Sequence, residues 1–267
     1  SCLCLLLSGF AVAEERLVFV SAFAPAPKGA IHAYRLDLES GKMTPAHRTT
    51  DAEHPFYFAV SPNQRFLYAI SAKQFGGKEP EYVAAYEIVG KNGELKLLNR
   101  QSARGSAACY LDVDATGKSV LVANYTTGSV ASFPVNDDGS LKEATSFIEH
   151  QGKSVDPARQ KEPHAHCIVV SPDNRFAFVA DLGLDRIVNY RLDSAKATLS
   201  PARQPFARTP PGAGPRHLTF HPNGTWMYVI NELSNSITMY DHDKQSGFLI
   251  EGNTVSTLPK DFAGKSY

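Results

Sequence analysis

The 267-residue chain lacks an excess of either charge, and it has no apolar run long enough to cross a membrane as a helix. It carries 27 basic and 27 acidic residues, so the sequence offers no electrostatic reason to bind nucleic acid or an anionic membrane surface. The one continuous apolar run, residues 3–13, is about half the length of the roughly 20 residues that a membrane-spanning helix needs. We therefore expect neither a nucleic-acid partner nor a membrane span.

The same run has the features of a secretory signal peptide. It ends with small residues at positions 11 and 13, and three charged residues follow at 14–16. The chain begins with Ser1 rather than Met, and the basic start of such a signal is missing. We interpret residues 1–13 as a signal peptide truncated at its start, which predicts a periplasmic or secreted protein. A cytoplasmic location is the alternative, in which the segment is a buried N-terminal strand.

Long helical patterns are also absent, and a repeat takes their place. Two short apolar strands joined by a tight turn recur four times along the chain. The residue before each turn is Ser61, Asp114, Ser171 or His221, so the steps are 53, 57 and 50 residues. A period near fifty with strand-like content indicates a radial array of β-blades around a central channel.

Each unit is predicted to hold four antiparallel strands. Pro, Asn, Asp and Gly in the first turn supply the backbone geometry of a tight hairpin. Third strands are expected at residues 83–88, 129–134, 186–191 and 236–240, and weaker fourth strands near 95–98, 141–145, 199–202 and 248–251. The predicted fold is an all-β propeller of four-stranded antiparallel blades, in a single domain over residues 14–267.

The units are predicted at residues 17–50, 54–103, 107–151, 164–207 and 215–257, with the start of another at 258–267. Residues 17–20 resemble a second strand, so the first unit lacks its innermost strand. We therefore expect an incomplete propeller, a fragment of a longer protein, whose open ring leaves two blade faces uncovered.

Cysteine is scarce, with four in the chain. Cys2 and Cys4 lie within the predicted signal, and Cys109 and Cys167 lie near the starts of first strands in neighbouring units. Export would permit a disulfide, but strands that splay radially need not bring two Cα atoms within about 7 Å. We predict that Cys109 and Cys167 are two separate core residues.

Strand direction predicts where the chemistry gathers. The start of a blade's first strand and the end of its second strand lie at the same end of the propeller, because the two strands are antiparallel. The residues at these positions are His164, His166, Arg216, His217, Asn231, Glu232, Asp181 and Tyr125. An imidazole, a guanidinium and a carboxylate that converge at one channel mouth suit a hydrolytic or anion-binding site.

Simpler explanations exist for some of these residues. His164 and His166 share a strand face and could form a metal pair, but no ligand set around them has the spacing of a structural zinc site. We therefore expect no metal and no cofactor. Glu232 could serve only as the buried ion partner of Arg216. The Pro- and Gly-rich loop 208–215 would bring Arg216 close to a ligand on a rigid backbone.

The segments GAGPRHLTFHPN at residues 212–223 and VINEL at 229–233 resemble the lactonase family of seven-bladed β-propellers. That family includes the bacterial propeller-type 6-phosphogluconolactonase and the fungal carboxy-muconate cyclase. Segments 166–175 and 256–262 match the same pattern. The Trp-Asp repeat family is disfavoured, because the chain has one Trp and no Trp-Asp dipeptide. The resemblance implies that about five of seven blades are present.

The resemblance further implies a metal-independent site with a histidine, two arginines and a glutamate. By motif position these are His166, Arg216 and Glu232, and the second arginine would fall beyond Tyr267. The implied activity is hydrolysis of a sugar (aldono-)lactone. His166 would act as general base with a pKa near neutrality, Arg216 would bind the developing oxyanion or a substrate phosphate, and Glu232 would orient one of them. The substrate-binding residues would be His164, His217, Asn231, Asp181 and Tyr125.

Other functions stay open at this point. A non-catalytic propeller could present the same mouth to a peptide, a glycan or a redox partner, since fold does not settle function. A muconate-type cycloisomerase could use the same arginines. A calcium-dependent lactonase of the regucalcin type is disfavoured, because it requires carboxylate and amide ligands around a central ion. If the protein is exported, its substrate is a sugar lactone other than the cytosolic phosphorylated one. We expect a monomer.

Overall fold

A computed structural model describes residues 15–25, 27–76, 81–264 and 266, and the predicted signal segment lies outside this part of the chain. The described residues form strands and no helix, so none of them belongs to a helix that could span a membrane. The strands are β1 (Glu15–Ala22), β2 (Ala30–Asp37), β3 (Met43–Thr49), β4 (Phe58–Val60), β5 (Phe66–Ala72), β6 (Glu81–Val89), β7 (Glu94–Ser102), β8 (Ala108–Val113), β9 (Ser119–Asn124), β10 (Ser129–Pro134), β11 (Ser146–Glu149), β12 (Ala165–Val170), β13 (Phe176–Asp181), β14 (Arg186–Asp193), β15 (Thr198–Arg208), β16 (Pro215–Phe220), β17 (Trp226–Asn231), β18 (Ser236–Asp243) and β19 (Phe248–Ser256).

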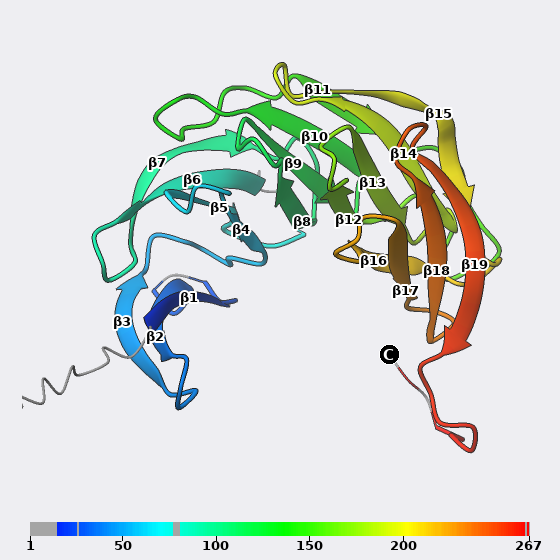
Figure 1. Cartoon of the computed structure of the whole chain (residues 1–267), viewed down its shortest axis with the longest axis horizontal. Coiled ribbons are helices and arrows are strands. Elements are labelled where there is room, and N and C mark those ends of the chain that lie inside the picture. The colour runs from blue at the N-terminus through cyan, green and yellow to red at the C-terminus, as the bar shows by residue number, and fades with distance from the viewer. Residues whose placement is uncertain (1–14, 26, 77–80, 265, 267) are drawn as a thin grey trace, which may run out of the picture.

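The strands form five antiparallel sheets in chain order, which we call blades 1 to 5. Blade 1 holds β1–β3, blade 2 holds β4–β7, blade 3 holds β8–β11, blade 4 holds β12–β15 and blade 5 holds β16–β19. Figure 1 shows them set along an arc, with β4, β8, β12 and β16 toward its inside. The prediction of an all-β propeller of four-stranded blades is confirmed, including a first blade of three strands.

The fourth strand of blade 3 differs from the prediction. It covers Ser146–Glu149, whereas the sequence pattern placed it near 141–145. Leu141 instead forms a lone bridge with Val135, and its backbone N–H and carbonyl both bond to the side chain of Asn99 in blade 2, at 3.0 and 2.7 Å. Because Asn99 of blade 2 hydrogen-bonds to the backbone of Leu141, the β10–β11 ladder of blade 3 begins only at Ser146.

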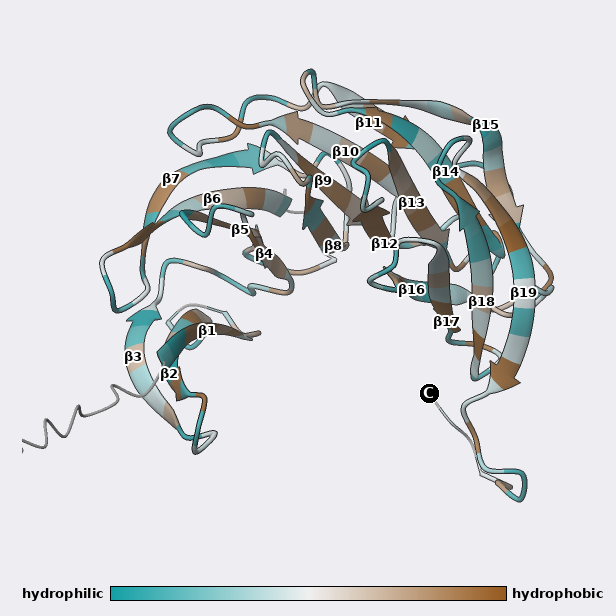
Figure 2. Cartoon of the chain, viewed as in Figure 1, coloured by the Kyte–Doolittle hydropathy of each residue, from teal (hydrophilic) through white to brown (hydrophobic). Residues whose placement is uncertain are grey.

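The second strands show which blades are packed on both faces. Strands β5, β9 and β13 are buried along their whole length, whereas β17 alternates between buried and exposed residues. Figure 2 shows β9 and β13 coloured hydrophobic along most of their length. A strand with apolar side chains on both faces belongs to a sheet covered on both sides. Blades 2, 3 and 4 are therefore interior, and blades 1 and 5 are terminal.

Apolar clusters fill the spaces between adjacent blades. The main buried members are Leu67 and Tyr86 between blades 1 and 2, Tyr68 and Phe133 between 2 and 3, Leu121 and Val179 between 3 and 4, and Phe178 and Tyr240 between 4 and 5. Burial of side chains of this size contributes about 2–3 kcal/mol each. The core of the protein is thus a series of layers between blades, which fixes the relative positions of the blade ends.

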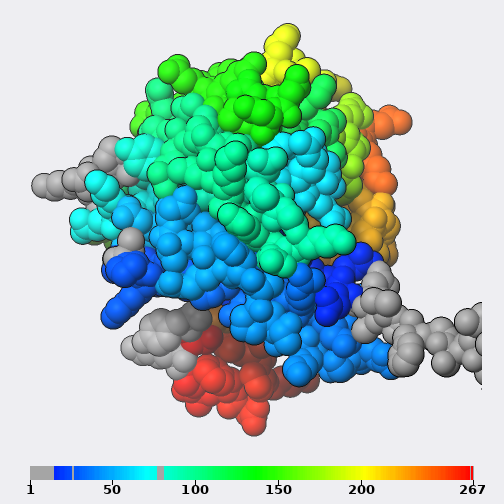
Figure 3. Space-filling model, turned by 90° about the vertical axis from the view of Figure 1, so that its left-hand side faces the viewer, coloured from blue at the N-terminus to red at the C-terminus, as the bar shows by residue number. Residues whose placement is uncertain are grey.

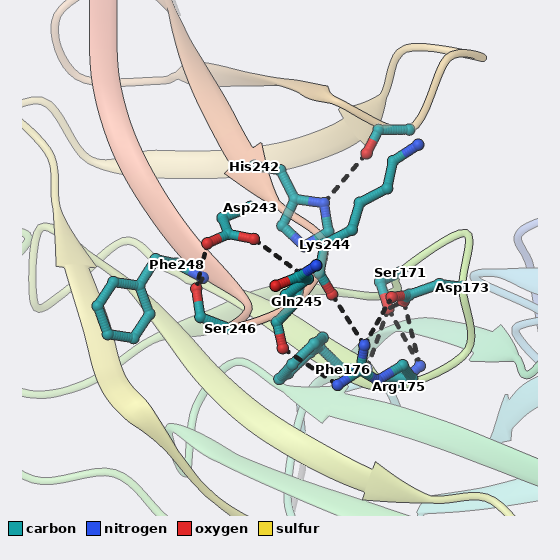
Figure 4. A network of polar contacts seen from close by, with 11 residues as sticks. Ser171, Asp173, Arg175, Phe176, His242, Asp243, Lys244, Gln245, Ser246 and Phe248 are labelled. Carbon is teal, nitrogen blue, oxygen red and sulfur yellow. Dashed lines mark hydrogen bonds and ion pairs between the residues drawn. The ribbon is translucent and has the colours of Figure 1, made fainter.

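Turns also join neighbouring blades. These turns lie at the end of the fold where the first strands of the blades finish. Arg175 in blade 4 donates to the carbonyl oxygens of Lys244 and Gln245 in blade 5, each at 3.1 Å (Figure 4). Gly247 follows in the same turn with φ of 74°, and a Cβ there would lie 2.5 Å from the ring of Phe176. Only glycine combines this backbone conformation with so close a contact.

The outer faces of the terminal blades expose apolar side chains. Val20 is exposed on blade 1, and Trp226, Ile250 and Val255 are exposed on blade 5. Figure 3 looks toward the blade 1 end, where its residues form the surface. The uncovered outer faces of blades 1 and 5 are consistent with the open ring that the repeat predicts.

The two described cysteines, Cys109 and Cys167, are free and buried, as predicted. The thiol of Cys109 donates to the carbonyl oxygen of His166 at 3.3 Å. Burial raises the pKa of both thiols, so each behaves as a small core residue.

Candidate active site

The predicted residues gather at one end of the channel. Strands β12 and β16 begin there, and the turns that follow β9 and β17 lie beside them, because consecutive strands of each blade are antiparallel. Six of the predicted residues form one connected group: Tyr125, His164, His166, Arg216, His217 and Glu232. The expected convergence of imidazole, guanidinium and carboxylate is present.

Glu232 joins two guanidinium groups. Its Oε2 pairs with Nε of Arg216 at 2.8 Å, and its Oε1 accepts a hydrogen bond from NH2 of Arg159 at 2.7 Å. Both arginine side chains are about two-fifths exposed, so these ion pairs contribute only about 0–1 kcal/mol to stability. The arrangement holds two cationic groups side by side while leaving them accessible.

Arg159 was not identified from the sequence. It lies in the loop 151–163 between β11 and β12, and its NH2 also approaches the hydroxyl of Tyr125 at 3.4 Å. These hydrogen bonds to Tyr125 and Glu232 raise the pKa of its guanidinium. The loop has no counterpart in the strand repeat, and repeat spacing therefore could not place it. The length of the loop could have indicated a functional residue there, since long connections without strands often carry function.

The rings form a continuous contact chain across the mouth. His164 stacks on Tyr125 with centroids 4.4 Å apart, and Tyr125 meets His166 edge-on at 5.5 Å. His166 in turn meets His217 edge-on at 5.1 Å. These contacts fix the orientation of His166 between blades 3 and 5.

His166 is buried, and its environment disfavours the imidazolium. Burial, followed by the charge of Arg216, lowers the pKa of His166 to about 3. This value differs from the near-neutral pKa expected from the sequence, because the order of residues does not show the burial of the ring or the guanidinium beside it. The imidazole is therefore neutral at ordinary pH and able to accept a proton.

His217 is neutral for similar reasons. Burial and the charge of Arg216 lower its pKa. Nη1 of Arg216 donates toward Nε2 of His217 at 3.4 Å, which requires that nitrogen to be unprotonated. With both imidazoles neutral, the cluster of Arg159, Arg216 and Glu232 carries a net positive charge.

Asp181 is held by neighbouring protein groups. It is fully buried, and its Oδ2 bonds to Nδ1 of His150 at 2.6 Å. Its Oδ1 accepts the backbone N–H of His164 at 2.8 Å and that of Leu184 at 3.2 Å. Both oxygens are engaged, Oδ2 by His150 at the end of blade 3 and Oδ1 by backbone groups of blade 4, so Asp181 fixes the backbone before β12.

Asn231 is held within blade 5 by its side-chain nitrogen. Its side-chain nitrogen donates to Ser236 at 3.1 Å and to Thr238 at 3.0 Å, and the residue is 1% exposed. It nonetheless borders a cavity of about 520 Å³ at this end of blade 5, which is also lined by Arg216, His217, Ile230 and Glu232. The cavity gives a small molecule access to the paired arginine and glutamate.

Asp185 joins two loops: the loop 151–163, which carries Arg159, and the loop 208–215, which leads into Arg216. It is buried and takes a left-handed conformation with φ of 51° in the turn after β13. Its carboxylate accepts the side chains of Ser154 and Gln160 from the loop 151–163 at 2.5 and 2.7 Å. It also accepts the backbone N–H groups of Gly212 and Gly214 from the loop 208–215 at 2.6 and 2.8 Å.

The loop 208–215 also fixes Glu232. The backbone N–H of Glu232 donates to the carbonyl of Gly214 at 2.8 Å. Gly214 has φ of 62°, and a Cβ there would lie 2.5 Å from the side chain of Leu233. Glycine is therefore required where this loop meets the turn, which explains the Gly-Pro-Arg pattern seen in the sequence.

Among the described residues, no group of three or more His, Cys, Asp or Glu side chains is arranged to hold a metal ion. His164, considered above as half of a metal pair and disfavoured, directs Nδ1 toward the carbonyl oxygen of Tyr125 at 3.1 Å. The chemistry available from the described side chains is proton transfer at an imidazole and anion binding at guanidinium groups.

Comparisons with known proteins identify the family of the chain. The family described as "Lactonase, 7-bladed beta-propeller" matches residues 17–267. A 6-phosphogluconolactonase of Bacillus subtilis is 35% identical over 93% of the chain and 68% of its own length. A second one, from Formosa agariphila, is 31% identical over 84% of the chain and 63% of its own length. The chain thus spans about two thirds of the length of these curated relatives.

Solved structures share the fold. The structure of a periplasmic gluconolactonase from Pseudomonas aeruginosa has a TM-score of 0.85 and 30% identity, and the match covers 94% of this chain and 71% of that one. The resemblance noted from the motifs around Arg216 and Glu232 is therefore confirmed. The chain belongs to the lactonase family of seven-bladed β-propellers.

Proposed function

We propose that the channel mouth hydrolyses a sugar lactone. The observation that carries this proposal is the bridging of Arg159 and Arg216 by Glu232 beside a neutral, buried His166. Relatives named 6-phosphogluconolactonase and a neighbour named gluconolactonase support the substrate class. The reaction adds water across the ring ester and yields the open sugar acid.

In this proposal Arg216 binds the lactone carbonyl oxygen. As water attacks, that oxygen becomes anionic, and a guanidinium already in place stabilises the charge without reorganisation. Glu232 holds Arg216 through Nε and His217 contacts Nη1, which leaves Nη2 of the guanidinium for the substrate. Removal of one such donor typically slows an acyl transfer about 100-fold or more.

His166 serves as the general base. The neutral imidazole accepts the proton of the attacking water and returns it to the ring oxygen as the ester bond breaks. Its low basicity results from burial and from the charge of Arg216. Charge building on the carbonyl oxygen beside Arg216 offsets that guanidinium, so the imidazole becomes more basic as the reaction proceeds.

The test is lactone turnover by His166→Gln and Arg216→Ala in the whole protein. Each should lower kcat/KM at least about 100-fold, within the range that loss of a general base or an oxyanion donor gives. His221→Gln is a matched control, because this histidine lies in a turn at the other end of blade 5, where its ring packs on Trp226. Near-normal rates in both site variants would remove the roles proposed here.

We also propose export to the periplasm. A neighbour named as periplasmic supports this location, as do the apolar and small residues at 3–13. The N-terminal sequence of protein recovered from a periplasmic extract should begin shortly after residue 13. An intact N-terminus in the cytosolic fraction would support the cytoplasmic alternative.

A further inference from the structure

The loop 151–163 brings a second arginine to the mouth, and the reaction steps proposed above assign this arginine no contact with the substrate. We propose that Arg159 is a specificity residue that binds an anionic substituent, a phosphate or a carboxylate, at the end of the lactone remote from the ester carbonyl. This inference rests on the proposed function, because it assigns the substrate class of the same site. It predicts a lactone that carries a negative charge of its own.

The geometry separates the two arginines by task. Arg216 is the second residue of β16, and its Nη1 contacts His217. Its charge lowers the pKa of His166 more than the charge of Arg159 does, so Arg216 lies nearer the reacting centre. Arg159 pairs with the other carboxylate oxygen of Glu232, Oε1, whereas Arg216 pairs with Oε2. Glu232 therefore sets a fixed spacing between a guanidinium at the ester and a second guanidinium displaced from it.

The charge balance favours an anionic substrate. Two guanidinium groups share one carboxylate, and the neighbouring His166 and His217 are neutral. One positive charge is thus left uncompensated in a partly enclosed mouth. A planar guanidinium with free N–H groups suits phosphate or carboxylate oxygens.

The loop is built to hold Arg159 in place. Asp156 accepts the backbone N–H groups of Ala158 and Arg159 at 2.7 and 2.9 Å, which forms a tight turn around the arginine. The next residue, Gln160, is fully buried and donates to the carbonyl of Leu182 at 2.8 Å and to Asp185 at 2.7 Å. The arginine is thus exposed at its guanidinium but anchored at its backbone.

Close backbone contact secures the far end of the loop. A Cβ at Gly183 would lie 1.9 Å from the carbonyl oxygen of Glu162, so the turn after β13 and the loop touch directly. An arginine that served only to neutralise Glu232 would not need this anchoring, because Arg216 already pairs with that carboxylate. The anchoring is what a binding residue requires, since a preorganised side chain loses less entropy on binding.

Binding of sugar acids, the products of the reaction, tests the proposal without depending on turnover. Calorimetric titration of the whole protein would use 6-phosphogluconate, glucarate and gluconate, which carry a terminal phosphate, a second carboxylate and a neutral terminal hydroxyl respectively. The wild type should bind 6-phosphogluconate, glucarate or both at least about tenfold more tightly than gluconate, the effect of about one charge-assisted hydrogen bond. Arg159→Ala should remove that preference while gluconate affinity changes less than about twofold. Arg159→Lys should retain part of it.

Arg104→Ala is the matched control. Arg104 precedes β8 at the same end of the molecule, and its guanidinium lies over the ring of Phe147 at 5.4 Å. This variant loses the same charge, so an equal loss of preference would mean that only the general field of the mouth is involved, and the assignment to Arg159 would be wrong. The assignment would also be overturned if gluconate bound the wild type as tightly as both charged acids, or if Arg159→Ala kept the preference.

The two proposals fail in different ways. A wild type that binds a charged sugar acid through Arg159 but turns over no lactone would contradict the proposed function and leave the role of Arg159 intact. A wild type that hydrolyses gluconolactone, a phosphorylated lactone and a carboxylated lactone with equal kcat/KM would support the function and overturn the role of Arg159.

Discussion

The carboxylate of Asp185 accepts the backbone N–H of Gly214 at 2.8 Å, two residues before Arg216. The same carboxylate bonds to Gln160, the residue after Arg159. A single buried side chain in blade 4 therefore fixes the backbone of the loop that carries Arg159 and of the loop that leads into Arg216. Its effect on the site is exerted through these loops, which makes Asp185 a positioning residue.

Replacing Asp185 should damage activity more than folding. Asp185→Ala leaves four donors without their acceptor and forces alanine into a left-handed conformation, so it should cost about 2–4 kcal/mol of unfolding free energy. We expect kcat/KM to fall about tenfold or more. Asp185→Asn should restore part of the stability and part of kcat/KM. Asparagine tolerates the left-handed conformation, as Asn235 does at the corresponding position of blade 5. Urea unfolding and steady-state kinetics measure the two effects. Unchanged kcat/KM in the alanine variant would show that the loops do not depend on this anchor.

Asp181 should be a residue of stability rather than of binding. Asp181→Ala removes the partner of buried His150 and the acceptor for the N–H of His164, which should destabilise the protein by about 3 kcal/mol. Asp181→Asn should cost less, because its amide oxygen can still accept the N–H of His164. Chemical unfolding at neutral pH is the measurement. A variant with wild-type stability but weakened sugar-acid binding would restore the substrate-binding role first expected for Asp181.

The acid limb of the pH–rate profile should lie below pH 5. The dependence of kcat/KM reports ionisations of the free enzyme, and the pKa of His166 is lowered to about 3. The imidazole therefore stays in its neutral, proton-accepting form as pH falls from 7 to 5, and kcat/KM should change less than about twofold over that interval. Steady-state rates in a constant-ionic-strength buffer series measure it. A decline centred near pH 6.5 would show that the ring is more basic than its burial and Arg216 allow.

Asp112 should make stability fall with rising pH. This partly buried residue lies on β8, and burial raises the pKa of its carboxyl to about 6. Between pH 4 and 6 the folded protein keeps a proton that the unfolded chain has lost, so the unfolding free energy decreases as pH rises. Full ionisation costs up to about 3 kcal/mol for a shift of about two units.

Asp112→Asn removes this titration. The asparagine oxygen can still accept the N–H of Val170, which donates to Oδ2 of Asp112 at 2.8 Å in the wild type. We expect the variant to be about 1–2 kcal/mol more stable than the wild type at pH 7 and no more stable at pH 4. Thermal unfolding at both pH values gives the comparison. Equal stability differences at pH 4 and pH 7 would mean that Asp112 titrates normally.

Much of the fold followed from sequence because each blade repeats the same strand pattern. Ser61, Asp114, Ser171 and His221 marked equivalent turns, and the structure places a first and a second strand around each. The fourth strand of blade 3 was misplaced because Leu141 bonds to Asn99 of another blade. That contact is tertiary, and no strand pattern within a unit encodes it.

The site residues also differ in whether the strand repeat could locate them. His166, Arg216 and Glu232 could be placed together because each occupies a defined position on a repeated strand or turn. Arg159 could not, since the loop 151–163 is irregular and its position depends on Asp185 and Gln160. The low pKa of His166 also depends on burial between blades, which the order of residues does not show.

A crystal structure of the whole protein with its most tightly bound sugar acid would test the proposed active site most directly. We predict that the carboxylate formed from the lactone lies against the guanidinium of Arg216 and beside the ring of His166, with the remote anionic group on Arg159. A sugar acid bound at the other end of the channel or on the outer strands, away from Arg216 and His166, would contradict the proposal.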